Sequence, residues 1–221
     1  MKNQKKTFDA VSLECSKQTT KVYSTRFSLA IKLLSKEYRS AIYSIYGFVR
    51  LADEIVDSFH DYNKSKLLNE LRYSTIDALE KKISLNPIIN SFQNTVKKYN
   101  IEWTLIDSFL ESMEYDLTNQ NCNDQSYKRY IEGSAEAVGL MCLQVFSNNQ
   151  NGQYQQLKPY AEALGSAFQK INFLRDMKED YSLLNRVYFP NLDIKNFSNI
   201  EKNMIEDDIA KDFAQGLEGI K

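Results

Sequence analysis

The sequence has 221 residues and a mass of 25.7 kDa, and it contains only seven Gly and three Pro. This scarcity of chain-reversing residues disfavours a β-sandwich or β-barrel, which needs many turns. The 28 basic and 29 acidic residues leave a formal net charge of −1, without the strongly basic character of a nucleic-acid-binding domain. We therefore expect a globular chain with no nucleic-acid partner.

The cysteines and the N-terminal segment indicate where the chain resides. Cys15, Cys122 and Cys142 form neither an even framework nor a CxxC pair, which is typical of unpaired thiols in a reducing compartment. Lys2, Lys5 and Lys6 precede no apolar run, and the chain nowhere holds 18 consecutive apolar residues. We expect a soluble, cytoplasmic protein. These lysines form either a solvated tail or a peripheral contact with an anionic membrane, from which an apolar substrate or product could exchange.

Apolar residues recur every three or four positions along almost the whole chain, which is the periodicity of amphipathic helices. Asn63 and Asn86 are suited to cap helices, and Pro87 is suited to a first helical turn. The pattern predicts a single all-α domain over residues 1–221, with helices at 8–33, 37–59, 64–83, 87–99, 102–117, 126–146, 154–184 and 199–219.

The last predicted helix carries an apolar stripe of Ile205, Ile209, Phe213 and Leu217 that runs almost to Lys221. A stripe that continues so close to the final residue needs a partner to cover it. We therefore expect that the chain is truncated at its C-terminus and lacks helices of its natural fold.

A first polar cluster lies on the otherwise apolar helix predicted at 37–59. Asp53 and Asp57 are four residues apart, so their carboxylates share one helix face, and Arg50 and Tyr46 extend the stripe toward the N-terminus. Two like charges at this spacing repel each other unless a cation lies between them. A solvated charged face is the alternative interpretation.

A second polar cluster lies on the helix predicted at 154–184. Asn172, Asp176 and Asp180 recur every four residues, with Arg175 beside them and Gln169 one turn earlier. Carboxylate and amide oxygens suit Mg²⁺, with Mn²⁺ as an alternative, whereas His60 is the only histidine and cannot build an imidazole site. Both polar clusters therefore offer the oxygen donors that suit Mg²⁺.

The predicted helix at 126–146 contains an unusual run of small residues, Gly133, Ser134, Ala135, Ala137 and Gly139. Each glycine costs a helix about 1 kcal/mol relative to alanine. The run permits either a close approach of another helix or an open cavity, and the spacing does not distinguish the two.

The motifs, in their order along the chain, resemble those of the squalene/phytoene synthase family, the head-to-head prenyl transferases. The segment 23–28 (YSTRFS) resembles the flap of this family, and 46–57 (YGFVRLADEIVD) resembles its first aspartate-rich motif. Tyr130 with Val138 and Gly139 is similar to the middle helix. The segments 169–180 (QKINFLRDMKED) and 186–190 (RVYFP) resemble the second motif and its tail. Glu54 departs from the pattern, because a second aspartate is common there.

The resemblance implies an all-α isoprenoid-synthase fold with a central cavity that binds two prenyl diphosphates through Mg²⁺. By position, Asp53, Asp57, Asp176 and Asp180 correspond to metal and diphosphate ligands, assisted by Asn172. The resemblance implies diphosphate contacts for Arg50 and Arg175, and places near the reacting centre for Tyr46, Tyr130 and Gln169. It further implies a prenyl channel lined by Phe27, Val138 and Gly139, and a flap with Ser24 and Arg26.

The implied reaction joins two geranylgeranyl diphosphates to phytoene through a cyclopropylcarbinyl diphosphate, as in bacterial carotenoid synthesis. No GxGxxG fingerprint is present, and we expect no NADPH requirement. One alternative is a squalene or dehydrosqualene synthase that uses farnesyl diphosphate. Others are a terpenoid cyclase or head-to-tail synthase, and a non-catalytic scaffold protein, which would be expected to lose the aspartates. The oligomeric state is left open.

Overall fold

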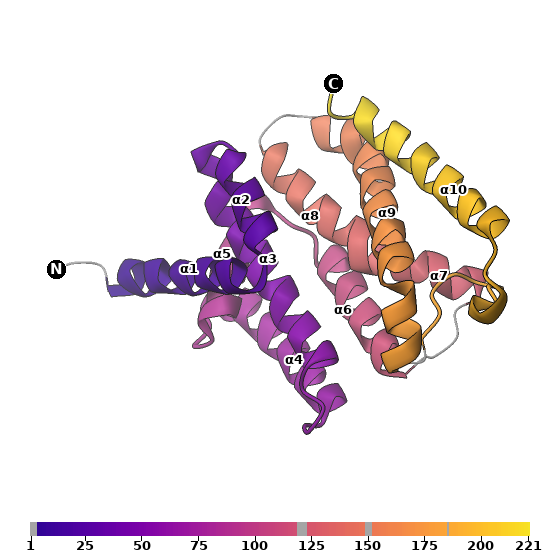
Figure 1. Ribbon diagram of the computed structural model, residues 1–221. Helices are drawn as coiled ribbons and strands as arrows, with labels where there is room; N and C mark the ends of the chain where they lie inside the picture. The colour runs from indigo at the N-terminus through magenta and orange to yellow at the C-terminus, as the bar shows by residue number, and fades with distance from the viewer. Residues whose placement is uncertain (1–3, 119–122, 149–151, 185) are drawn as a thin grey trace. The chain divides into compact units, whose positions relative to one another are not determined.

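The computed structural model describes residues 4–118, 123–148, 152–184 and 186–221. Helices dominate this part of the chain and no β-strand occurs in it, which confirms the predicted all-α class. The elements are α1 (Gln4–Tyr23), α2 (Thr25–Leu33), α3 (Lys36–Asp57), α4 (Lys64–Lys81), α5 (Pro87–Tyr99), α6 (Trp103–Thr118), α7 (Asp124–Ile131), η1 (Glu132–Glu136), α8 (Ala137–Phe146), α9 (Gln153–Glu179), η2 (Asp180–Leu184), η3 (Ile194–Asn196) and α10 (Asn199–Glu218) (Figure 1).

The chain divides into two compact units. Unit 1 comprises Met1–Glu102 and Gln144–Asn148, and unit 2 comprises Trp103–Leu143 and Asn149–Lys221. Whether the two units form the single domain expected from the sequence stays a prediction. No described helix is both long and apolar enough to cross a bilayer.

In unit 1, α3 packs against α1 and α5 (Figure 1). Its apolar face supplies the centre of this unit: Ile45, Phe48 and Ala52 are almost fully buried, and the Phe48 ring stacks on Phe92 of α5 with centroids 4.0 Å apart. Burying an aromatic side chain of this size contributes about 2–3 kcal/mol. The helix that carries the first aspartate pair is therefore fixed along its opposite, apolar face.

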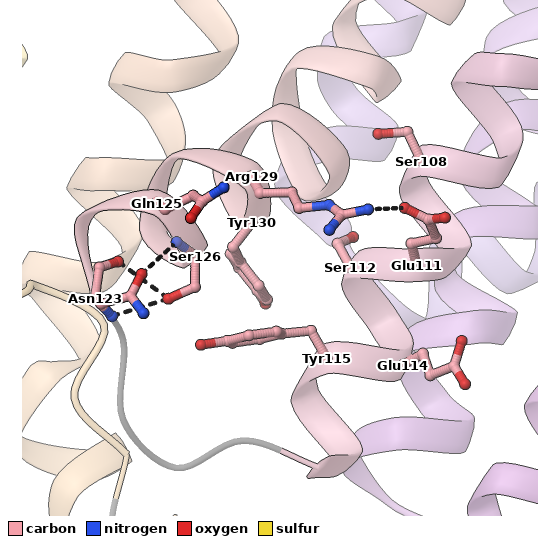
Figure 2. Close-up of a pocket in the computed structure, with 10 residues that line it drawn as sticks. All are labelled: Ser108, Glu111, Ser112, Glu114, Tyr115, Asn123, Gln125, Ser126, Arg129 and Tyr130. Atoms are coloured by element: carbon pink, nitrogen blue, oxygen red, sulfur yellow. Dashed lines mark hydrogen bonds and ion pairs between the residues drawn. The ribbon is translucent and has the colours of Figure 1, made fainter.

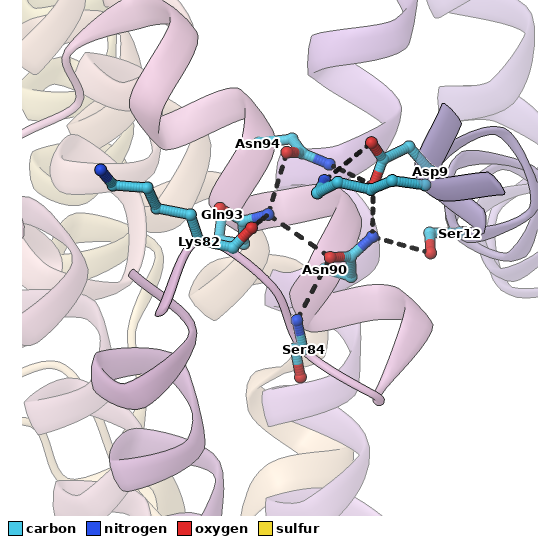
Figure 3. Close-up of polar contacts among 8 residues, drawn as sticks. Asp9, Ser12, Lys82, Ser84, Asn90, Gln93 and Asn94 are labelled. Carbon is cyan, nitrogen blue, oxygen red and sulfur yellow. Dashed lines mark hydrogen bonds and ion pairs between the residues drawn. The ribbon is translucent and has the colours of Figure 1, made fainter. Parts of the chain in front are cut away.

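A buried polar network also joins α1 to α5 (Figure 3). The Asn90 side-chain amide donates hydrogen bonds to Asp9 and Ser12 of α1, each at 3.0 Å, and its carbonyl accepts from the Ser84 backbone at 3.2 Å. The Asn94 amide also donates to Asp9, at 3.1 Å. Because Asn90 is fully buried, its satisfied hydrogen bonds remove the cost of burying an amide in this interface.

The predicted helix at 8–33 is wrong in one respect, because it is two helices. Ser24 breaks it: its backbone is extended, with φ −147° and ψ 94°, and its hydroxyl accepts a hydrogen bond from the Phe27 amide at 3.2 Å. A serine at this position satisfies an amide that would lack a partner in the first turn of α2. Asn63 and Asn86 cap α4 and α5 as predicted.

In unit 2, the π-helical turn η1 lies at the centre and packs against α6, α7 and α9. Gly133 allows this approach, because a Cβ atom there would meet the Ser108 carbonyl oxygen of α6 at only 2.4 Å. A Cβ at Gly165 of α9 would lie 3.1 Å from the Ala135 carbonyl oxygen. The run of small residues could permit either close helix packing or an open cavity. Close packing is what the structure shows at Gly133 and where Ala135 meets Gly165.

The helix α10 lies along α9 (Figure 1). The nearly buried Lys170 ammonium of α9 donates to Asp208 and, at 2.8 Å, to Asp212 of α10, while the Ser166 hydroxyl donates to Asp212 at 2.6 Å. Of the predicted apolar stripe, Ile209 is buried, whereas Phe213 and Leu217 remain exposed. Polar clamps as well as apolar packing therefore hold α10 to the helix of the second aspartate pair.

Candidate active site

The first aspartate pair lies on the continuous helix α3 of unit 1, so Asp53 and Asp57 are one helical turn apart as predicted. Asp53 is half-buried and Asp57 is exposed. One turn earlier, the Arg50 guanidinium donates two hydrogen bonds to Glu54 Oε2, at 3.1 and 2.6 Å, and lies 4.6 Å from the centroid of the Tyr23 ring. The sequence did not predict this role for Tyr23, since a tyrosine at a helix end gives no such signal.

The ion pair changes the acidity of Glu54. Burial alone raises the pKa of its carboxyl, but hydrogen bonds from Ser58 and Arg50 and the charge of Arg50 outweigh it and hold the pKa below the ordinary value. Glu54 is therefore a charged carboxylate that forms an ion pair with Arg50. Glu54 is the residue that departs from the family pattern. Its partner within the protein is Arg50, one turn earlier on α3.

The start of α2 is joined to α3 by contacts around Tyr46. The Phe27 ring stacks on the Tyr46 ring with centroids 4.6 Å apart, and the Ser24 side chain hydrogen-bonds Tyr46. Burial is the main cause that raises the pKa of Tyr46, so its phenol stays neutral. The structure thus brings together Ser24, Phe27, Tyr46 and Arg50, whereas Arg26 lies exposed on the first turn of α2.

The second aspartate pair belongs to unit 2. Asp176 lies on α9 and Asp180 begins the π-helical turn η2, so the predicted stripe with Asn172 is continuous. All three side chains are half-buried, as is Gln169. The exposed Arg175 is paired with its neighbour Asp176, with 2.7 Å between Nε and Oδ1. The arginine thus partly neutralises the carboxylate next to it.

Tyr130, at the end of α7, is buried and donates its hydroxyl proton to Asp116 Oδ2 of α6 at 2.6 Å. It borders a pocket of about 480 Å³ between α6 and α7, which Figure 2 shows with Ser108, Glu111, Ser112, Glu114, Tyr115, Asn123, Gln125, Ser126 and Arg129. The ion pair between Arg129 and Glu111, 3.2 Å long, spans this pocket. Asp116 was missed in the sequence, because nothing in the pattern distinguishes a buried aspartate from a solvated one.

Val138 and Gly139 lie half-buried on the first turn of α8 in unit 2. A Cβ at Gly139 would lie 3.4 Å from the Ala161 carbonyl oxygen, an ordinary contact distance.

The predicted site residues are distributed over both units. Unit 1 holds Ser24, Arg26, Phe27, Tyr46, Arg50, Asp53 and Asp57, and unit 2 holds Tyr130, Val138, Gly139, Gln169, Asn172, Arg175, Asp176 and Asp180.

The donor sets of the two aspartate pairs fit a particular kind of metal site. Within the described residues, no three His, Cys, Asp or Glu side chains are grouped so that they could hold a metal ion by themselves. Mg²⁺ does not require such a cage, because it commonly binds one or two carboxylates and completes its octahedron with water and substrate phosphates. Each pair therefore fits Mg²⁺ that arrives with a phosphate-bearing ligand.

Sequence comparison identifies several relatives of the chain. A phytoene synthase of Mycobacterium bovis is 25% identical over 77% of this chain and 55% of its own length. A 4,4'-diapophytoene synthase of Staphylococcus haemolyticus is 25% identical over 88% of this chain and 69% of its length, and a hydroxysqualene synthase of Zymomonas mobilis is 30% identical over 74% and 54%. The chain thus spans about half the length of the mycobacterial and Zymomonas enzymes.

Solved structures share the fold. A squalene synthase from Alicyclobacillus acidocaldarius superposes with a TM-score of 0.79 at 19% identity, covering 94% of this chain and 82% of that one. A dehydrosqualene synthase in complex with a ligand gives 0.78 at 22% identity, covering 96% and 76%. The chain therefore has the all-α fold of these synthases. The model of the squalene/phytoene synthase family matches residues 20–218, and the chain belongs to this family.

Proposed function

We propose that this chain catalyses the Mg²⁺-dependent head-to-head condensation of two prenyl diphosphates, with release of diphosphate. The observation that carries the proposal is the pairing of aspartates one turn apart on α3 and again at the end of α9, each beside an arginine, in a member of the squalene/phytoene synthase family. Retention of all four aspartates favours an enzyme over a non-catalytic scaffold protein.

The aspartates are the groups that would hold the metal. Asp53 and Asp57 on one helix, and Asp176 and Asp180 with Asn172 on the other, offer the hard oxygen donors that Mg²⁺ prefers, and Mn²⁺ is an acceptable substitute. When bound, Mg²⁺ supplies Lewis-acid neutralisation of the charge on the leaving diphosphate. Arg50 and Arg175 donate hydrogen bonds to diphosphate oxygens, for which a planar guanidinium is well suited.

The side chains around the reacting centre have to tolerate an allylic cation. Neutral Tyr46 and Tyr130 present ring faces that attract positive charge, and Gln169 adds an amide oxygen. In this proposal, Phe27, Val138 and Gly139 line the channel for the prenyl chains and exclude water from the cation. Ser24 and Arg26, at the start of α2, belong to a flap over the diphosphate.

For the substrate, we propose geranylgeranyl diphosphate and the product phytoene, with no requirement for NADPH. The similarity to a phytoene synthase supports this choice. The similarity to a 4,4'-diapophytoene synthase and a hydroxysqualene synthase makes farnesyl diphosphate the alternative substrate. The two substrates carry the same diphosphate and differ only by one apolar isoprene unit, so the assay offers both and identifies the product by mass.

The test is incubation of the purified chain with equal concentrations of geranylgeranyl and farnesyl diphosphate, with Mg²⁺ or with excess chelator. The extracted lipid is identified by mass, and the released diphosphate is counted. We expect Mg²⁺-dependent phytoene and two diphosphates per product. A C30 product would assign farnesyl diphosphate instead. A single diphosphate per product would indicate a cyclase or head-to-tail enzyme, and the absence of any product would contradict the proposed function for this chain.

A further inference from the structure

Asp116, in the last turn of α6, is a nearly buried carboxylate whose described partners include Tyr130, Tyr188 and Arg186. Its Oδ2 accepts the Tyr130 hydroxyl at 2.6 Å, and its Oδ1 accepts the Tyr188 hydroxyl at 3.1 Å. The Arg186 Nη1 lies 3.7 Å from Oδ1, and the Arg186 Nη2 donates to the Asp116 backbone carbonyl. With 8% of its surface exposed, Asp116 depends on these partners to remain charged.

We propose that Asp116 is a positioning residue for Tyr130, fixing the direction of its hydroxyl proton so that the phenol oxygen presents its lone pairs to the reacting prenyl chain. This inference rests on the proposed function, in which Tyr130 lies at the reacting centre. A phenolic hydroxyl rotates about its C–O bond, and a short charge-assisted hydrogen bond restricts that rotation. Asp116 thereby determines which side of the Tyr130 oxygen is free to accept.

The same contact keeps the phenol protonated. Burial first, and then the negative charge of Asp116, raise the pKa of Tyr130 well above that of an exposed tyrosine. A phenolate next to an allylic cation would form an ether bond with it and stop the reaction. A neutral phenol whose proton is held by a carboxylate has an electron-rich oxygen that stabilises the cation without being consumed.

The ring of Tyr130 is fixed as well as its hydroxyl. Its centroid lies 5.2 Å from the Tyr188 ring and 5.6 Å from the Phe173 ring, and these two rings stack on each other at 4.2 Å. Phe173 follows Asn172 directly on α9, so the cluster that holds Tyr130 also packs against the helix of the second aspartate pair. Asp116 thus couples α6, α7 and the segment after η2 around one phenol.

A double-mutant cycle tests whether Asp116 acts through Tyr130. We expect Asp116→Asn and Tyr130→Phe each to lower kcat at least about tenfold while KM changes less than about threefold, and the double variant to be no slower than the slower single variant. Glu111→Gln removes an exposed carboxylate of the same helix that pairs with Arg129 of α7, and it serves as the matched control, with kcat expected within about threefold of wild type. Losses that multiply in the double variant would overturn the proposal.

A second readout does not depend on catalysis or on the stability of a variant. Tyrosine labelled with ¹³C at Cζ is followed by NMR against pH, with Tyr130 assigned by its loss in Tyr130→Phe. We expect the Tyr130 signal to stay unchanged through about pH 10, the ordinary pKa of a tyrosine side chain, and to titrate at lower pH in Asp116→Asn than in wild type. A Tyr130 that ionises at about pH 10, as an ordinary tyrosine does, or whose titration is unaffected in Asp116→Asn, would overturn the proposal. A wild-type chain without turnover would contradict the proposed function, whereas an active chain with multiplied losses contradicts only the role of Asp116.

Discussion

Arg50 places both of its donated hydrogen bonds on a single oxygen of Glu54, which lies one turn further along α3. The guanidinium also lies over the Tyr23 ring, 4.6 Å from its centroid. Arg50 is therefore oriented by two neighbours within unit 1, which would prepare it for the proposed contact with diphosphate. An arginine held in this way loses less side-chain entropy when it binds an anion than a freely rotating arginine would.

The first prediction concerns Glu54→Gln, which removes the charge but keeps the shape of the side chain. We expect the free energy of unfolding at pH 7 to fall by about 0.5 kcal/mol, as for other helical ion pairs four residues apart. The folded pKa of Glu54 is lowered from 4.5, so the contribution of its charge is complete above that value and is lost as the pH falls through the folded pKa. Urea unfolding of both proteins from pH 7 to pH 3 measures this; a difference that grows on acidification would contradict it.

The second prediction concerns the glycines around the π-helical turn. Gly133→Ala forces a Cβ to within 2.4 Å of the Ser108 carbonyl oxygen, and we expect it to destabilise unit 2 by about 2–3 kcal/mol. Gly139→Ala is the matched control, since its Cβ meets its nearest neighbour at 3.4 Å and alanine favours a helix by about 1 kcal/mol. Equal unfolding midpoints for the two variants would show that η1 does not require the close approach.

The third prediction concerns Lys170, whose ammonium forms ion pairs with Asp208 and Asp212 of α10. Replacing both Asp208 and Asp212 by Asn leaves a nearly buried ammonium without a counter-charge, at a cost of about 3 kcal/mol. Lys170→Met keeps the apolar stem and is expected to cost about 1 kcal/mol. Hydrogen exchange of the α10 amides measures both effects, and unchanged protection in the double Asn variant would refute the clamp.

The fourth prediction concerns Glu136 in η1. Burial, and then the charges of Glu162, Glu132 and Asp212, raise its pKa to about 7, against a lowering effect of Lys128. Because the folded state keeps this proton longer than the unfolded state, stability falls as the pH rises from 4.5 to about 7. Glu136→Gln is therefore expected to exceed wild type in stability at pH 8, by about 1 kcal/mol after allowance for screening by solvent, and to match it near pH 4. A variant less stable than wild type at pH 8 would contradict the assignment.

Helical periodicity was sufficient to predict the all-α class and most helix positions. Apolar residues that recur every three or four positions are buried together when the chain is helical, and a chain with few turn-forming residues has few alternatives. Asn63 and Asn86 were identified as caps because a side-chain oxygen at that position has one evident partner. The role of Ser24 as the N-cap of α2 was not predicted, because a serine within a helical pattern is compatible with both a cap and a helix interior.

The aspartate pairs were found in the sequence because helical spacing alone puts Asp53 and Asp57 on one face. The pairing of Arg50 with Glu54 and the burial of Asp116 could not be found in the same way. Which acidic partner a charged side chain selects, and whether a polar side chain is buried, depend on tertiary packing, and a one-dimensional pattern does not contain it.

In the proposed function, the two aspartate pairs act with Mg²⁺ on a prenyl diphosphate. Its most direct test is Mg²⁺-dependent release of diphosphate from geranylgeranyl diphosphate by wild type, Asp53→Ala and Asp176→Ala, with the exposed Asp61→Ala as control and urea unfolding of each protein. We expect release by wild type and Asp61→Ala. Asp53→Ala and Asp176→Ala are expected to lose at least about a hundredfold in release while their unfolding remains cooperative. Undiminished release by folded Asp53→Ala or Asp176→Ala would show that the aspartates do not have this role.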